Sequence, residues 1–503
     1  MRKTLKNMDR HDWIRSARHW GLGALLGLIA LLTACSRPST LEEIHQENVL
    51  HVVTLNAPST YYVGRDGPAG FEYEMAKRFA DYLGVELRIQ VVDNLADLFS
   101  ILNQGYTHFA AAGLTLTDER RKLYGTSPSY LEAQPVVIYH RGSERPRSPE
   151  DLADRHIRVI ANSAHIKRLQ TLAQQYPSIR WEARTDIGTI DLLKAVNEGD
   201  IDLAIIDSND LAMNQVFFPK VARGFKLQGK AQYAWLFPTN QDPSLLKEAD
   251  RFFKQIRNDG TLAQLRERYY GHLDQLNYVG ARTFVYHLRN RLPNYKDTFQ
   301  EAAQKYGLDW RLLAAIGYQE SHWRPNAVSP TGVRGLMMLT QATARHIGIE
   351  NRLDPESSIL GGAGYFRQIY DRLPEHITDP DRTWFALASY NVGMGHLEDA
   401  RILAERDGKD PDKWMHVKEY LPRLAQKKWY VQTEHGYARG HEPVVYVQNI
   451  RRYYDVLKWM MSPDEHEAMY ANQATKKEES SEPLQSLAEL EEDGALDITP
   501  PAL

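Results

Sequence analysis

Hydrophobic and polar residues follow two different rhythms along the chain. Between residues 47 and 273, short apolar runs rich in β-branched residues alternate with segments whose apolar positions recur at helical spacing. The sequence predicts strands at 49–55, 86–92, 110–116, 136–140, 157–161 and 203–207, and helices at 73–83, 94–103, 164–176, 189–198 and 243–259. This alternation favours α/β units with mostly parallel sheets, whose ligands bind beyond the carboxyl ends of the strands.

From residue 295 to about 462 the β-branched runs disappear and amphipathic helical spacing takes over, which predicts a mainly α domain. Beyond this domain the chain turns polar, and from Lys476 it is acidic, as a solvated, disordered tail would be; an acidic docking segment is the alternative. The predicted boundaries are 1–34 for a leader, 35–46 for an N-terminal linker, 47–273 for the α/β domain, 274–294 for a second linker, 295–462 for the α domain and 463–503 for the tail.

Composition narrows the function classes. The chain has 503 residues, 43% of them hydrophobic, and a formal net charge of -4. A near-neutral balance without a basic stripe argues against a nucleic-acid partner. One cysteine excludes an internal disulfide framework and a zinc site built from thiolates, and we expect neither a metal nor a cofactor.

The single cysteine follows an apolar stretch near the N-terminus. The first twenty residues are net positive, residues 21–34 carry no charge, and Cys35 comes next. Fourteen helical residues span about 21 Å, less than the ~30 Å hydrocarbon core, so a secretory signal is favoured over a membrane span. Residues 32–35 (Leu-Thr-Ala-Cys) resemble a bacterial lipobox. The resemblance implies an acylated Cys35 that anchors the chain in the bilayer, and Ser36 after it implies the periplasmic face of a Gram-negative outer membrane; a plain signal peptide is the alternative.

Three ordered segments of the α/β region carry a second resemblance. They are residues 70–75 (Gly-Phe-Glu-Tyr-Glu-Met), 112–120 (Ala-Gly-Leu-Thr-Leu-Thr-Asp-Glu-Arg) and 202–207 (Asp-Leu-Ala-Ile-Ile-Asp). Together they resemble the family-3 periplasmic solute-binding proteins, in which two α/β lobes enclose a small ligand.

This resemblance implies a role for four residues. Arg120 would grip a ligand carboxylate, Gly113 and Thr115 would supply hydrogen bonds, and Asp207 would receive an ammonium group. A surface salt bridge of Arg120 with Asp118 or Glu119 is the alternative. The implied ligand is an amino acid, a peptide or a muropeptide. The choice among them stays open because the loops at residues 57–62 and 161–164 depart from the family's usual pattern.

One carboxylate stands out in the α region. Asp309 is a suitable helix N-cap, and after it Leu313, Ile316 and Glu320 fall on one face of a helix. A carboxyl group at the end of an apolar stripe loses hydration, which raises its pKa and suits it to protonate a leaving group. The alternative is that Glu320 turns into solvent at the helix end.

The neighbouring motifs favour the catalytic interpretation. Glu320-Ser321, Gly335-Leu336-Met337, Tyr390-Asn391 and Tyr446-Val447 occur in this order over about 170 residues. The order resembles the family-1 lytic transglycosylases, which have a goose-type-lysozyme-like fold. By this resemblance Glu320 is the general acid and then the general base. Ser321 orients the substrate or the acid, and Met337, Tyr390, Asn391 and Tyr446 line the saccharide groove; Met338 stands where glutamine is common.

The two resemblances imply a murein-cleaving enzyme whose α/β domain senses a small ligand. Most glycosidases use two carboxylates, whereas these motifs supply one. The family resolves this through the 2-acetamido group and the C6 hydroxyl of the substrate, which leave 1,6-anhydromuramoyl ends on the glycan strands of peptidoglycan. A non-catalytic solute- or glycan-binding lipoprotein and a lysozyme-type hydrolase are the alternatives.

Overall fold

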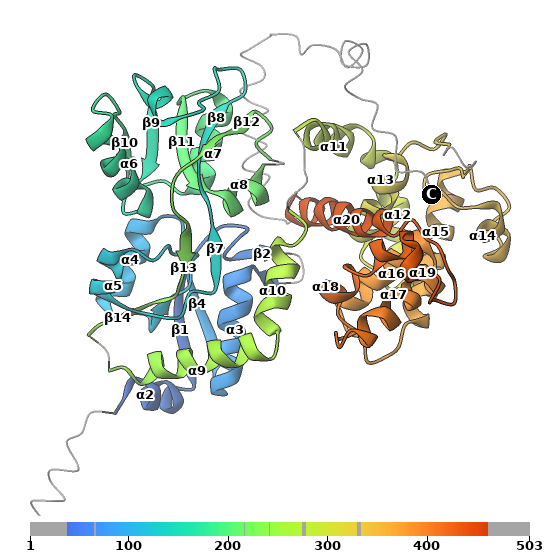
Figure 1. Cartoon of the computed structure of the whole chain (residues 1–503), viewed down its shortest axis with the longest axis horizontal. Helices are drawn as coiled ribbons and strands as arrows, with labels where there is room; N and C mark the ends of the chain where they lie inside the picture. The colour runs from blue at the N-terminus through green and yellow to red at the C-terminus, as the bar shows by residue number, and fades with distance from the viewer. Residues whose placement is uncertain are drawn as a thin grey trace, which may run out of the picture.

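The computed structural model describes residues 38–64, 67–215, 217–240, 242–273, 278–328 and 333–460. Cys35, the leader and the acidic tail lie outside these residues. Figure 1 shows an α/β body in blue to green beside a helical body in olive to red. The predicted fold class, a two-lobed α/β domain followed by a mainly α domain, is confirmed.

The first lobe is built on a five-stranded sheet in the order β4-β1-β5-β14-β6. β1 pairs in parallel with β4 and β5, whereas β14 runs antiparallel to β5 and β6. Its strands are β1 (Val49–Leu55), β4 (Glu86–Val92), β5 (Phe109–Ala110), β6 (Tyr124–Thr126) and β14 (Leu236–Pro238), with a hairpin of β2 (Tyr62–Gly64) and β3 (Gly67–Ala69). Its helices are α2 (Thr40–Glu47), α3 (Phe71–Leu83), α4 (Leu95–Gln104), α5 (Asp118–Leu123), α9 (Ser244–Asn258) and α10 (Thr261–Tyr270).

The second lobe has its own five-stranded sheet in the order β10-β9-β11-β8-β12. Its strands are β8 (Pro135–His140), β9 (Ile157–Ile160), β10 (Glu182–Arg184), β11 (Leu203–Asp207) and β12 (Val221–Lys226), and its helices are η1 (Pro149–Leu152), α6 (Ala164–Gln175), α7 (Thr189–Glu198) and α8 (Ser208–Asn214). The chain crosses between the lobes along β7 (Leu131–Ala133) and β13 (Ala231–Tyr233), which pair antiparallel. Both sheets are therefore mixed, not mostly parallel as predicted.

The strand predicted at 110–116 is wrong in extent. β5 ends at Ala110, and Gly113 then adopts φ +60°, which turns the chain out of the sheet. The backbone of Thr115 instead bridges to Tyr233 on the crossover strand β13. The segment thereby lies at the junction of the two lobes.

The helical domain surrounds one buried helix, α13 (Trp310–Ser321), all of whose residues are buried. Its other elements are α11 (Tyr278–Asn290), η2 (Leu292–Asn294), α12 (Lys296–Tyr306), α14 (Gln341–His346), α15 (Pro355–Arg372), α16 (Asp381–Val392), α17 (Met394–Arg406), α18 (Trp414–Val417), η3 (Leu421–Ala425), α19 (Lys427–Tyr430) and α20 (His441–Met460). α13 packs on α12, α15 and α20 within one continuous apolar core.

The described parts of two segments predicted as linkers, residues 38–46 and 278–294, belong to the domains. Ser39 and Glu42 form a capping box at the start of α2, and Ile44 of this helix is buried in the core of the first lobe. In the second segment, Phe284, Leu288 and Leu292 are buried in the core of the helical domain. The apolar spacing of Phe284 and Leu288 is that of one helix face, and this face packs on the domain that follows.

The two domains meet where the end of α10 contacts Lys418, the residue after α18, and α20. Glu267 of α10 accepts hydrogen bonds from Lys418 Nζ at 2.7 Å and from Arg451 Nη1 at 2.9 Å. His272 Nε2 lies 2.7 Å from Asp455 Oδ2 of α20. Across the described ranges, no helix combines the length and apolar character that a membrane crossing needs.

Candidate functional site

Glu320 lies in the last turn of α13 and is 4% exposed. Burial raises the pKa of its carboxyl group from 4.5 to about 8, and the hydrogen bond from Tyr446 lowers it only in part. A carboxyl group with this pKa is protonated at neutral pH, as general-acid catalysis requires. The alternative, that Glu320 turns into solvent, is wrong.

Two tyrosines from other helices converge on this carboxyl group. Tyr446 of α20 is buried and donates a hydrogen bond of 2.5 Å to Glu320 Oε1. Tyr390 of α16 donates one of 3.1 Å to the carbonyl oxygen of Met337. Burial raises the pKa of both phenols well above 10, and the charge of an ionised Glu320 raises it further. Both phenols therefore stay protonated and remain hydrogen-bond donors.

Ser321 lies beneath the site, not in it. Its hydroxyl is fully buried and lies 2.8 Å from the carbonyl oxygen of Leu336 and 3.1 Å from that of Gly317. No hydrogen bond joins it to Glu320 in the described part of the chain. The predicted role of Ser321 in orienting the substrate or the acid therefore does not rest on a hydrogen bond to Glu320: its hydroxyl fastens the turn around Leu336 to the end of α13.

The Gly-Leu-Met turn is likewise a supporting element. Gly335 has φ +94°, and a Cβ at this position would meet the carbonyl oxygen of Arg352 at 2.0 Å, so only glycine fits. Met337 is fully buried, and its N–H donates to Ser358 Oγ at 3.0 Å. Its side chain packs against glycines of α13 and α15. The expectation that the Met337 side chain lines the groove is therefore corrected, since this residue contributes a backbone carbonyl that holds Tyr390.

Of the remaining residues predicted near the groove, Asn391 lies at the end of α16. It is half-buried and directly follows Tyr390. Met338 is buried and packs with Ala327 and Val333 instead of offering a polar group. Sequence reasoning missed Tyr365 of α15, whose ring centroid lies 5.5 Å from that of Tyr390. No local pattern in the sequence pointed to this contact, which depends on how α15 packs on α16.

In the described residues, no second carboxyl group is hydrogen-bonded to Glu320, and its pKa is set by burial and by Tyr446. Glu442, four residues before Tyr446 in the first turn of α20, accepts a hydrogen bond of 3.3 Å from Arg439 Nη1. The described residues contain no group of three or more His, Cys, Asp or Glu side chains able to hold a metal ion.

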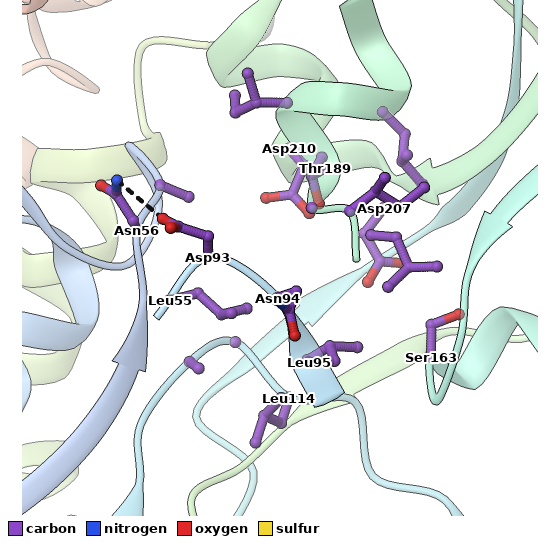
Figure 2. A pocket seen from close by; sticks show the side chains of 18 of the residues that line it. Leu55, Asn56, Asp93, Asn94, Leu95, Leu114, Ser163, Thr189, Asp207 and Asp210 are labelled. Atoms are coloured by element: carbon purple, nitrogen blue, oxygen red, sulfur yellow. Dashed lines mark hydrogen bonds between the residues drawn. The ribbon is translucent and has the colours of Figure 1, made fainter. Parts of the chain in front are cut away.

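A second site lies between the two α/β lobes, as a cavity of about 490 Å³. Figure 2 shows Leu55, Asn94 and Leu114 of the first lobe facing Asp207 and Asp210 of the second. Arg120, Gly113, Thr115 and Asp207 all line this cavity. The structure therefore brings the four predicted ligand residues together.

Arg120 joins the lobes. Its Nη1 donates to the carbonyl oxygen of Thr115 at 2.6 Å, and its Nη2 donates to that of Asn162 in the second lobe at 2.8 Å. The guanidinium also lies over the ring of Phe99, 5.1 Å from its centroid. Burial lowers the pKa of Arg120 to about 10, so it stays charged at neutral pH. The alternative of a surface salt bridge with Asp118 or Glu119 is wrong, because Arg120 is 7% exposed and donates to backbone carbonyls.

The backbone N–H of Gly113 already has a partner. It donates to Glu72 Oε1 at 3.0 Å, and Glu72 also accepts from Tyr130 and Trp235. The Gly113 N–H is therefore not available to a ligand in this structure. Glu72 is 1% exposed and holds the segment at the cavity in place.

Two aspartates form the acidic side of the cavity. Asp207, 6% exposed, ends β11 and accepts a hydrogen bond of 2.9 Å from Tyr233 on Oδ2. Asp210, one turn later, accepts one of 3.1 Å from Ser59 of the other lobe. Burial, and then the charge of Asp207, raise the pKa of Asp210 to about 7.

Comparisons with known proteins find a family match for each of the two domains. Residues 50–272 match the family "Bacterial extracellular solute-binding proteins, family 3", and residues 297–413 match the "Transglycosylase SLT domain" family. A solved structure, "An ancestral arginine-binding protein bound to arginine", aligns with 44% of this chain and 98% of its own, at 21% identity and a TM-score of 0.41.

Curated relatives match over most of the chain. A protein of Hahella chejuensis is 53% identical over 88% of this chain and 88% of its own length. A protein of Marinobacter nauticus is 55% identical over 87% of each chain. Both are named "Membrane-bound lytic murein transglycosylase F". At this identity and coverage, the chain belongs to the family of membrane-bound lytic murein transglycosylases F.

Proposed function

We propose that the protein is a lytic transglycosylase that cleaves the β-1,4 bond between N-acetylmuramic acid and N-acetylglucosamine in peptidoglycan. The single observation that carries this is the buried carboxyl group of Glu320, held by Tyr446 at 2.5 Å and protonated at neutral pH. In the first step Glu320 gives its proton to the glycosidic oxygen, and the bond from this oxygen to C1 of the muramic acid breaks.

The substrate supplies the nucleophiles. The 2-acetamido oxygen attacks C1 as the leaving sugar departs, which replaces the second carboxylate of ordinary glycosidases. The C6 hydroxyl of the same sugar then forms a bond to C1, releases the acetamido group and returns its proton to Glu320. This internal attack has a high effective molarity and leaves a 1,6-anhydro end.

The surrounding residues position the acid and the glycan. Tyr446 orients the carboxyl group of Glu320 and donates to its ionised form. We assign Tyr390 and Asn391 to the wall of the saccharide groove, since both are half-buried at the end of α16. Ser321 and Met337 are positioning residues: Ser321 holds the backbone at Leu336, and the carbonyl oxygen of Met337 holds the Tyr390 hydroxyl.

Digestion of purified murein tests the mechanism. Mass spectrometry of the released fragments is expected to find 1,6-anhydro ends, whereas reducing ends would indicate a lysozyme-type hydrolase. Glu320→Gln is expected to lose release and to keep glycan binding, while Glu375→Gln, an exposed carboxylate of the same domain, keeps full activity. No release by the unaltered protein would favour a non-catalytic binder.

We also propose that a small ligand in the α/β domain modulates turnover. The supporting observation is that α20 carries both Tyr446, which holds the acid, and Arg451, which binds Glu267 at the end of α10. Measuring murein release by the full chain with and without soluble muropeptides tests this. Unchanged turnover with a ligand known to be bound would contradict it.

The remaining proposals concern the chain as a whole. We propose domains at 47–273 and 295–462, extended at their N-terminal borders by α2 and α11; the family matches at 50–272 and 297–413 and the packing of these two helices support this division. We place the protein at the periplasmic face of the outer membrane, anchored through acylated Cys35, because residues 32–35 match a lipobox. Labelling with an alkynyl fatty acid in a Gram-negative host is expected to mark the unaltered protein and to leave Cys35→Ser unmarked.

A further inference from the structure

The cavity between the lobes carries more negative than positive charge. Its charged lining residues are Arg120 and four carboxylates; His165 also lines it. Asp93 and Asp191 are exposed, whereas Asp207 and Asp210 are not. Burial lowers the pKa of His165, so this imidazole is neutral at pH 7. A ligand buried here must balance this excess, because enclosing unpaired charges is costly.

Asp207 provides a specific anionic atom. Its Oδ2 accepts the hydroxyl of Tyr233, but its buried Oδ1 has no hydrogen-bond partner anywhere in the described ranges. His165 Nε2 lies 4.0 Å from this oxygen, beyond hydrogen-bond distance. A buried carboxylate oxygen without a donor points to a donor that arrives with the ligand.

Asp210 provides a second, separate position. It follows Asp207 by one helical turn and lines the same cavity, as Figure 2 shows. One of its oxygens accepts a hydrogen bond from Ser59. The two carboxylates are close enough that the charge of Asp207 acts on Asp210, so a ligand with two cationic groups would relieve their repulsion.

Arg120 keeps the means to bind an anion. A guanidinium has five N–H groups, and two of those of Arg120 reach the carbonyls of Thr115 and Asn162. The cavity therefore offers one cationic group and two interior carboxyl groups. A molecule with one carboxylate and two cationic groups would complement them, because a cation beside Asp210 favours the ionised form of its carboxyl group.

We propose that this cleft selects a cationic amino acid, or a peptide ending in one, and that Asp210 is the residue that recognises its second positive charge. Arg120 receives the carboxylate and Asp207 the α-ammonium. This rests on the proposed ligand-binding role of the α/β domain and adds the chemical class of the ligand.

Calorimetric titration of the full chain with matched pairs of probes tests the proposal. The pairs are L-lysine with L-norleucine, L-ornithine with L-norvaline, and L-arginine with L-citrulline, each pair differing in the side-chain charge. At least one cationic member is expected to bind more tightly than its neutral partner by about tenfold or more, as for a charge-assisted hydrogen bond. Equal affinities within every pair, or no binding by any of the three cationic probes, would overturn the proposal.

Variants separate the two carboxylates. Asp210→Asn keeps an acceptor for Ser59 and is expected to abolish the preference for the cationic probe while the affinity for the neutral one changes little. Asp207→Asn is expected to weaken both members of the pair. Asp200→Asn, an exposed residue of the same lobe outside the cavity, serves as the control. A preference that survives Asp210→Asn would overturn the assignment.

Murein release measured on the same preparations keeps the two proposals apart. An active enzyme that binds none of the probes contradicts the ligand assignment alone. A protein that discriminates between the probes but releases no fragments from murein contradicts the proposed enzymatic function alone.

Discussion

Tyr446 Oη lies 2.5 Å from Glu320 Oε1, although 126 residues separate the two in sequence. The contact joins α20 to α13, which pack closely. It places a donor that stays protonated on a carboxyl group that must change its protonation state during each turnover. The strength and direction of this hydrogen bond should therefore appear in the pH dependence of the reaction.

The alkaline limb of the pH–rate profile reports the acid. Because Glu320 must be protonated to start the reaction and burial raises its pKa to about 8, kcat/KM is expected to stay level through neutral pH and to fall above about pH 8. Rates of murein solubilisation from pH 5 to 10 provide the measurement. A decline already centred near pH 5 would show that another group limits the rate.

Removing the phenol should move this limb. In Tyr446→Phe the carboxylate loses a donor that lowers its pKa, so the limb is expected to shift to higher pH while the maximal rate falls. Tyr176→Phe, which alters an exposed tyrosine–glutamate contact in the α/β domain, is the matched control. An unshifted limb in Tyr446→Phe would contradict the contact as a determinant of acidity.

The buried acid should also lower stability at alkaline pH. The pKa of Glu320 is about 8 when folded and near 4.5 when unfolded, so between these values the folded state holds a proton that the unfolded state has lost. Stability from this group is complete below about pH 4.5 and is lost as the pH rises through 8. Glu320→Gln is expected to gain thermal stability over the unaltered protein as the pH is raised from 5 to 8.

Calorimetric scans at both pH values measure this difference. Glu72 and Asp210, whose pKa values are raised to about 7, act in the same direction but are present in both proteins, so they cancel. A difference in melting temperature between Glu320→Gln and the unaltered protein that does not change with pH would contradict this prediction.

Ser321→Ala is expected to act through stability. Its loss leaves the buried carbonyl oxygen of Leu336 without this donor, at a cost of about 1–3 kcal/mol. Thr171→Ala removes a similar hydroxyl–carbonyl bond on an exposed helix, where a change within about 0.5 kcal/mol is expected. Because Ser321 does not touch the carboxyl group, the alkaline limb should stay in place; a shifted limb would indicate direct contact with the acid.

Glu267→Gln is expected to loosen the docking of the two domains. The carboxylate of Glu267 accepts hydrogen bonds from Lys418 and Arg451. Losing the charge on this acceptor should weaken the interface by about 1–3 kcal/mol. Small-angle X-ray scattering of the full chain would then give a larger radius of gyration. Glu132→Gln, which breaks an exposed ion pair with Lys230, is the control and should leave the scattering curve unchanged. Equal curves for the unaltered protein and both variants would show that the contacts of Glu267 do not hold the domains together.

Local patterns and motifs predicted the fold class and located Glu320, because a helix face and its burial follow from spacing within one segment. They could not show which side chain would meet Glu320, since the contact with Tyr446 depends on how α13 and α20 pack. The buried positions of Ser321 and Met337 could not be predicted for the same reason: their partners, Leu336 and Tyr390, are set by a turn whose position only the folded domain defines. The spacing of Phe284 and Leu288 is typical of one helix face, but the sequence analysis predicted a linker there, because the segment lies between the two domains.

The hydrogen bonds of Arg120 to Thr115 and Asn162 mean that backbone carbonyls of both lobes already occupy part of the anion-binding group. Three N–H groups of the same guanidinium remain for the carboxylate of the proposed ligand. The contact between the lobes and the proposed affinity of the cleft are therefore coupled through one side chain, so a substitution of Arg120 would change both at once.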